Sequence, residues 1–157
     1  MDKITETKKK ILKSLKNEQK IVINKCYGGF GLSMKALQRY AELKGFKLYF
    51  YESTSYKLGH EKFERIDDVN KKPTFMFHSV KKDFGKITDK LDDKEYFSIY
   101  DFDRDDEVLV QVVEELGKEA NGSHSELEVV EIPQGVEWEI DNYDGIETVE
   151  EKHRSWG

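Results

Sequence analysis

A short apolar strand that runs directly into a glycine-rich loop is the feature that most constrains this chain. Residues 20–25 (KIVINK) are typical of a buried strand. Three glycines follow closely: Gly28, Gly29 and Gly31. Ser33 is a natural helix N-cap, and the spacing of apolar residues predicts a helix over 34–44, followed by an alternating strand at 46–51. We therefore predict an opening β-loop-α-β unit over residues 20–51, with parallel strands and a right-handed crossover.

The C-terminal third adds a further helix and two or more strands. The acidic run at residues 103–107 favours a helix start, and apolar residues continue at helical spacing as far as Ala120. Strands are predicted at 127–132 and 136–141, joined as a C-terminal β-hairpin, and a short final helix is predicted at 146–154. The sum is an α/β or α+β fold, with a mixed sheet of about five or six strands and three or four helices.

The chain divides into an N-terminal arm and one domain. Residues 1–19 contain an amphipathic, lysine-rich helical pattern with a narrow apolar stripe, which predicts a peripheral helix or an arm. Residues 20–157 hold few prolines and no repeat, and their length suits a single α/β domain.

Charge is distributed unevenly along the sequence. Residues 101–157 hold 18 of the 32 acidic residues but only four of the 26 basic ones, and the net charge of the chain is −6. An acidic C-terminal third disfavours broad nucleic-acid binding, because it repels phosphates. The acidic C-terminal third can instead attract the more basic remainder of the chain, either within one fold or between subunits of a homo-oligomer.

Several classes of protein are excluded by composition. No stretch approaches the length of an apolar membrane span, and the lysine-rich N-terminus lacks an apolar signal core, so we expect a cytoplasmic protein that does not bind membranes. A single cysteine, Cys26, rules out an internal disulfide and a cysteine-based zinc cluster. The aspartates from Asp101 onward fail the EF-hand pattern, which would need glycine at Asp106 and glutamate at Val112. We predict no metal and no cofactor.

The glycine-rich loop is the first candidate for a binding site. Glycines permit close approach of the backbone to a ligand, and a helix N-terminus presents free N–H groups that suit a phosphate or carboxylate. The spacing matches neither G-x-G-x-x-G nor a Walker motif, and a structural alternative is that the glycines only allow a sharp turn. The candidate ligand-binding residues in this segment are Lys25, Tyr27, Gly28, Gly29, Gly31 and Ser33.

The C-terminal segment holds a second group of candidates. His153, Arg154 and Trp156 are residue types that bind anions or stack on rings, and we predict them as partners of the glycine loop. The alternative is a capped terminal helix with Trp156 packed at the edge of the core.

Cys26 raises the weaker alternative of an enzyme. It ends the first strand close to a helix N-terminus, which lowers the pKa of a thiol. A nucleophile also needs a base, and none of the four histidines lies in a recognisable catalytic signature. The alternative is that Cys26 is a small residue of the core. We predict no catalytic residue.

Several motifs resemble a known protein family. They are INKCYGGFGLS at 23–33, RDD at 104–106, VVEELG at 112–117, ANG at 120–122, VEIP at 130–133, WEI at 138–140, YDG at 143–145 and EKHRSW at 151–156. This set, which spans most of residues 20–157, is similar to small proteins carried by bacteriophages, prophages and some larger viruses. The resemblance implies an accessory factor that acts in the host cytoplasm on metabolism or defence, and it implies no particular reaction.

Two functions follow as hypotheses. The first is a phage-type protein that binds a small phosphate-bearing, nucleotide-like ligand without turnover and thereby sequesters a host defence signal. The second is an acidic interaction module that blocks a host protein, for example by nucleic-acid mimicry.

Overall fold

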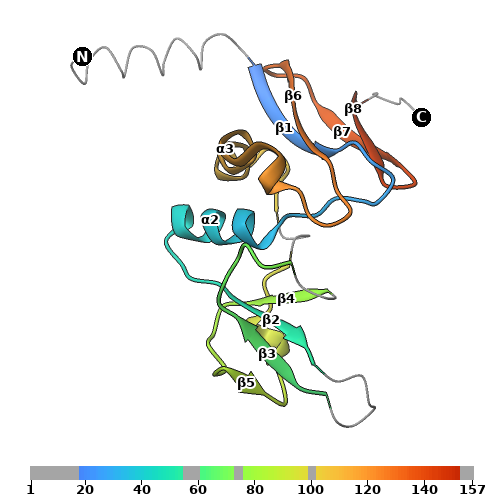
Figure 1. Ribbon diagram of the computed structural model, residues 1–157. Coiled ribbons are helices and arrows are strands. Elements are labelled where there is room, and N and C mark those ends of the chain that lie inside the picture. The colour runs from blue at the N-terminus through green and yellow to red at the C-terminus, as the bar shows by residue number, and fades with distance from the viewer. Residues whose placement is uncertain (1–17, 55–60, 73–75, 99–101, 153–157) are drawn as a thin grey trace, which may run out of the picture.

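The computed structural model describes residues 18–54, 61–72, 76–98 and 102–152 (Figure 1). Within these residues the chain forms eight strands in three antiparallel sheets, together with two α-helices. The α+β class is therefore confirmed. The predicted N-terminal helix falls outside the described residues, except that Glu18 and Gln19 belong to the first strand.

The first sheet pairs two strands from opposite ends of the chain. β1 (Glu18–Asn24) runs antiparallel to β6 (Leu127–Pro133), with Val22 opposite Val129. The three apolar residues of β1, Ile21 to Ile23, are almost completely buried. Because successive side chains of a strand point to opposite faces, β1 is covered on both sides.

The second sheet has four strands in the order β4-β2-β3-β5, all antiparallel to their neighbours. Its strands are β2 (Tyr49–Ser53), β3 (Phe63–Ile66), β4 (Phe77–Val80) and β5 (Ile87–Thr88). One face, which includes Phe50 and Ile66, packs into the main hydrophobic core. The other face carries a smaller core around Tyr51 and Val80.

The third sheet is a C-terminal hairpin of β7 (Trp138–Tyr143) and β8 (Ile146–Glu151). Its two-residue turn places Asp144 and Gly145 at positive φ (50° and 94°), as the tightest hairpin turns require. The predicted C-terminal hairpin is confirmed, but β7 and β8 form it and not the predicted strands at 127–132 and 136–141. The predicted helix at 146–154 is wrong for Ile146–Glu151, which form a strand.

The main core lies between two layers of strands. α2 (Met34–Lys44) and α3 (Glu107–Leu116) lie between the β1–β6 sheet and the four-stranded sheet (Figure 1). A short 3-10 helix, Gly117–Ala120, continues α3, and another lies at Asp93–Glu95. The Tyr40 hydroxyl of α2 donates a hydrogen bond of 2.6 Å to Asp106, the N-cap of α3, and so joins the two helices.

The predicted pairing of the opening strands is wrong. The order strand, loop, helix, strand is present as β1-loop-α2-β2, and Ser33 and Gly45 cap α2. However, β1 and β2 lie in different sheets, so there is neither a parallel crossover nor a single mixed sheet among the described residues. The edge of β1 that does not pair with β6 is covered by the backbone at Arg104. There the Val22 N–H donates a hydrogen bond of 2.8 Å to the Arg104 carbonyl.

His78 makes the stability of the four-stranded sheet dependent on pH. Its ring lies between those of Phe63 and Tyr96, with centroid distances of 5.5 and 5.8 Å. Burial lowers its pKa below the ordinary value near 6.5, and the Glu61 carboxylate opposes this only in part. The unfolded chain therefore binds more protons than the folded one just below pH 6.5, and stability falls as the pH drops through that window.

We predict that His78→Phe reduces this loss of stability. Urea unfolding at pH 7.5 and 5.5 should show a smaller decrease in the free energy of unfolding for His78→Phe than for the wild type. His124→Gln, which changes an exposed imidazole, is the matched control and should behave as the wild type does. An equal decrease in all three proteins would contradict the prediction.

Candidate functional site

The glycine-rich loop between β1 and α2 is packed against two other segments of backbone. A Cβ atom on Gly28 would overlap the carbonyl oxygen of His124. On the other side, a Cβ on Gly145 in the β7–β8 turn would lie 2.5 Å from the carbonyl oxygen of Tyr27 and 2.9 Å from the nitrogen of Gly29. These glycines allow three backbone segments to meet.

Hydrogen bonds join the loop to the segment that connects α3 with β6. The Lys25 N–H donates to the Glu126 carbonyl at 2.8 Å, and the Ser33 N–H donates to the Ala120 carbonyl at 3.0 Å. Between them, the Gly31 carbonyl accepts from the Gly122 N–H at 3.2 Å and from the Ser125 hydroxyl at 2.6 Å. The loop is thus tied along its length to residues 120–126.

A buried polar network holds the start of this loop. Asn24 is fully buried; its amide donates to the carbonyls of Cys26 and Gly145, each at 2.7 Å, and its backbone N–H donates to the Glu147 carboxylate at 2.8 Å. Glu147 in turn accepts two hydrogen bonds from the Arg104 guanidinium, at 2.7 and 2.9 Å. These contacts fix the hairpin and the loop relative to β1.

The structure places the predicted loop residues unequally. Lys25 and Tyr27 are exposed, Tyr27 to 69%. Gly28 and Gly29 lie at the backbone junction described above, whereas Ser33 lines a pocket on the other side of residues 121–124. His153, Arg154 and Trp156 lie outside the described residues, so their predicted meeting with the loop stays a prediction.

Cys26 is held by two hydrogen bonds. Its thiol donates to the carbonyl oxygen of His124 at 3.1 Å and to the side-chain oxygen of Asn24 at 3.4 Å. This environment suits a structural cysteine.

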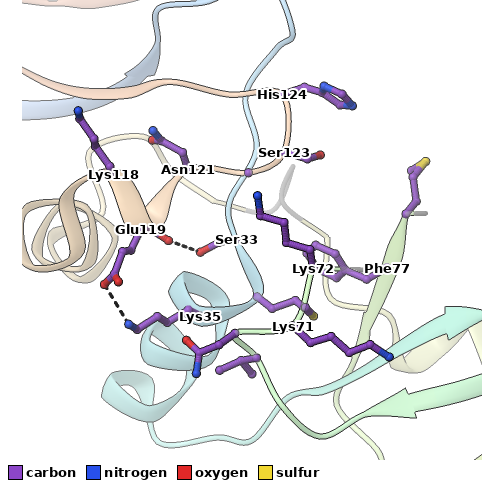
Figure 2. A pocket seen from close by; sticks show the side chains of 15 residues that line it. Ser33, Lys35, Lys71, Lys72, Phe77, Lys118, Glu119, Asn121, Ser123 and His124 are labelled. Carbon is purple, nitrogen blue, oxygen red and sulfur yellow. Dashed lines mark hydrogen bonds and ion pairs between the residues drawn. The ribbon is translucent and has the colours of Figure 1, made fainter. Parts of the chain in front are cut away.

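A pocket of about 970 Å³ opens beside the N-terminus of α2 (Figure 2). Three segments distant in the sequence form its walls: the start of α2, the β3–β4 connection with the start of β4, and residues 118–124 after α3. Four of the lining residues are lysines: Lys35, Lys71, Lys72 and Lys118. Glu119 is the acidic residue among the lining residues, so the pocket is basic in a chain of net charge −6.

Two of the four lysines are ion-paired. Lys35 lies 2.9 Å from the Glu119 carboxylate, and Lys71 lies 3.4 Å from Glu52. Lys72 and Lys118 have no ion-pair partner among the residues that the structure describes. In Figure 2 the Lys72 amine points toward the wall formed by residues 121–124, whereas Lys71 extends away from it. The Lys118 amine points away from Lys72 in the same view, so Lys72 is the unpaired cation directed across the pocket, and Lys118 adds positive charge at its rim.

Polar groups that can accompany an anion lie near these amines. Ser33 caps α2, where its hydroxyl accepts a hydrogen bond from the Ala36 N–H at 3.1 Å and donates to the Glu119 carbonyl at 2.6 Å. The first N–H groups of a helix have no intrahelical partner and favour negative charge. The side chains of Ser123 and His124 are exposed at the same pocket.

Sequence reasoning missed most of this pocket. The local signals were the Lys71-Lys72 pair and the Asn121-Gly122-Ser123-His124 turn, but nothing in their spacing relates them to Ser33. Only the tertiary fold brings them together. Among the described residues there is no group of three or more histidine, cysteine, aspartate or glutamate side chains placed to hold a metal ion. Nor does the described part of the chain contain a helix long and apolar enough to cross a membrane.

Comparisons with known proteins give no independent assignment. No family model matches the chain, and neither the curated proteins nor the solved structures contain a significant match. The resemblance to phage proteins therefore stays a prediction, and the functional argument depends on the site itself.

The packing of the glycine loop predicts different effects for two similar substitutions. Gly28→Ala should lower the free energy of unfolding by about 1–3 kcal/mol, because the added methyl group overlaps the His124 backbone. Gly31→Ala is the matched control: it has open space around the new Cβ and should leave stability nearly unchanged or slightly raised. Urea denaturation of the two variants measures the difference, and equal effects would contradict this account of the loop.

Proposed function

We propose that this protein binds a small phosphate-bearing anion in the lysine-lined pocket and does not turn it over. The observation that supports this proposal is the local reversal of charge. Lys72 and Lys118 line the pocket without ion-pair partners among the described residues, although the chain as a whole is acidic. The ligand would sit between the Lys72 amine and the N-terminus of α2, with the Ser123 hydroxyl as a hydrogen-bond donor.

The size of the pocket supports a small ligand rather than a nucleic acid. A volume of about 970 Å³ lies at the upper end of the usual range for small-molecule sites. Outside it, exposed acids on the hairpin, such as Glu139 and Asp141, would repel an extended chain of phosphates. A compact ligand of the nucleotide type avoids that repulsion.

Binding without chemistry is supported by the residue types that line the pocket. Glu119 already pairs with Lys35, and His124 is the imidazole among the lining residues. Cys26 does not line this pocket. These residues can hold an anion, but they do not form an arrangement of nucleophile, base and orienting group.

The biological setting of the proposal comes from the resemblance to phage proteins. Within that setting, a protein that retains a nucleotide-like ligand would act by sequestering a host defence signal in the cytoplasm. This part of the proposal depends on the resemblance, whereas ligand binding depends on the pocket.

Calorimetric titration with sodium tripolyphosphate and with ATP at low ionic strength tests the proposal. The wild type should bind both, and the Lys72→Gln/Lys118→Gln double variant should bind them at least about tenfold more weakly, because two charge-assisted contacts are lost. The difference in affinity between the wild type and the double variant should become smaller at high salt, because salt screens exposed charges.

Lys25→Gln is the matched control in this experiment, because Lys25 is exposed and belongs to the glycine loop rather than to the pocket. Its affinity should equal that of the wild type. Weakening by Lys25→Gln alone would place the anion at the glycine loop instead. No heat with either ligand would overturn the proposed function.

A second candidate function is docking to a basic host protein through the hairpin. Glu139 and Glu150 are exposed and lie directly opposite each other on β7 and β8, a like-charge pair that destabilises a sheet. A cationic partner would relieve this repulsion. Glu150→Lys should raise the free energy of unfolding by about 0.2–1 kcal/mol and weaken low-salt capture of basic host proteins, whereas unchanged capture would count against this role.

A further inference from the structure

Apolar side chains occupy one part of the lysine-lined pocket. Met76 and Phe77, at the start of β4, line it together with Val69 from the β3–β4 connection. Met76 is 82% exposed, the largest value among the exposed large hydrophobic residues of the described chain. Met76 therefore presents most of its side chain to solvent at the edge of a basic pocket.

The three apolar residues differ in how firmly they are held. Phe77 is half-buried and meets the ring of Phe50 edge-on at 5.8 Å, and Val69 packs against the main core. Phe77 and Val69 therefore form a fixed surface, while Met76 is free to adapt. A rigid ring beside an adaptable thioether is suited to a flat aromatic group, because methionine sulfur packs well against ring edges.

Charged and apolar side chains lie next to each other in the pocket. Met76 and Phe77 share a wall with Lys72. The Lys72 amine points across the pocket toward residues 121–124 in Figure 2, where Ser123 lies. The pocket thus combines a cation directed across it with an apolar surface at the start of β4.

We propose that the ligand is a nucleoside phosphate bound in one orientation. Its phosphates face Lys72 and Ser123, and its base packs against Met76 and Phe77. This inference rests on the proposed function and adds to it the class of ligand and the residues that distinguish a nucleotide from a bare polyphosphate.

The test compares ligands that share three phosphates. Calorimetric titrations would use ATP, GTP, CTP and UTP against sodium tripolyphosphate. At least one nucleotide should bind the wild type about fivefold or more tightly than tripolyphosphate, since stacking of a base on a protein surface typically supplies that much. Met76→Ser should remove most of this advantage and leave the affinity for tripolyphosphate unchanged.

Ile87→Ser is the matched control, because Ile87 is also an exposed apolar residue (62%) but does not line the pocket. It should bind every ligand as the wild type does. If tripolyphosphate binds as tightly as every nucleotide, or if Met76→Ser keeps the full nucleotide advantage, the inference is overturned while the proposed anion site stands. If no ligand binds the wild type, both the site and the inference are overturned.

Discussion

The rest of this structure depends on the ion pair between Arg104 and the buried carboxylate of Glu147. The two side chains form a bidentate pair, and Glu147 also accepts the backbone N–H of Asn24, so the buried carboxylate has a full set of donors. Hydrogen bonds to the buried carboxylate offset the free energy that is lost when the charge leaves water. The Arg104 side chain additionally donates to the Val22 carbonyl at 3.2 Å and lies against the Phe30 ring, 3.5 Å from its centroid. Arg104 thereby covers the edge of β1 that is not paired with β6.

This contact connects the fold to the candidate site. By docking the hairpin on β1, it brings the Gly145 turn against the backbone at Tyr27 and Gly29, and the loop is confined between that turn and residues 121–126. The confined loop leads into Ser33, which fixes the start of α2 beside Lys118 and the 121–124 wall. The glycines therefore shape the pocket from a distance, while the cations that face it come from other segments.

Local patterns predicted the local elements well. The apolar run of β1, the serine cap and the glycine end of α2 are short-range signals, and each appears in the structure. The strand at Ile146–Glu151 was missed because the segment 146–154 begins with acids and ends with bases, as helices do, although the Asp144-Gly145 turn is a strong hairpin signal. Strand pairing and the pocket were not predictable in this way, because β1 pairs with β6, and Ser33 and Lys72 line the same pocket, only through long-range packing.

Backbone amide chemical shifts followed during titration with ATP show where the anion binds. We expect the largest shifts in three segments that come together only in the folded pocket: residues 34–36, 70–72 and 121–124. Amides of Tyr27–Gly29 should change little, since their role is packing. Shifts concentrated at residues 25–29, with the three pocket segments unchanged, would contradict the account.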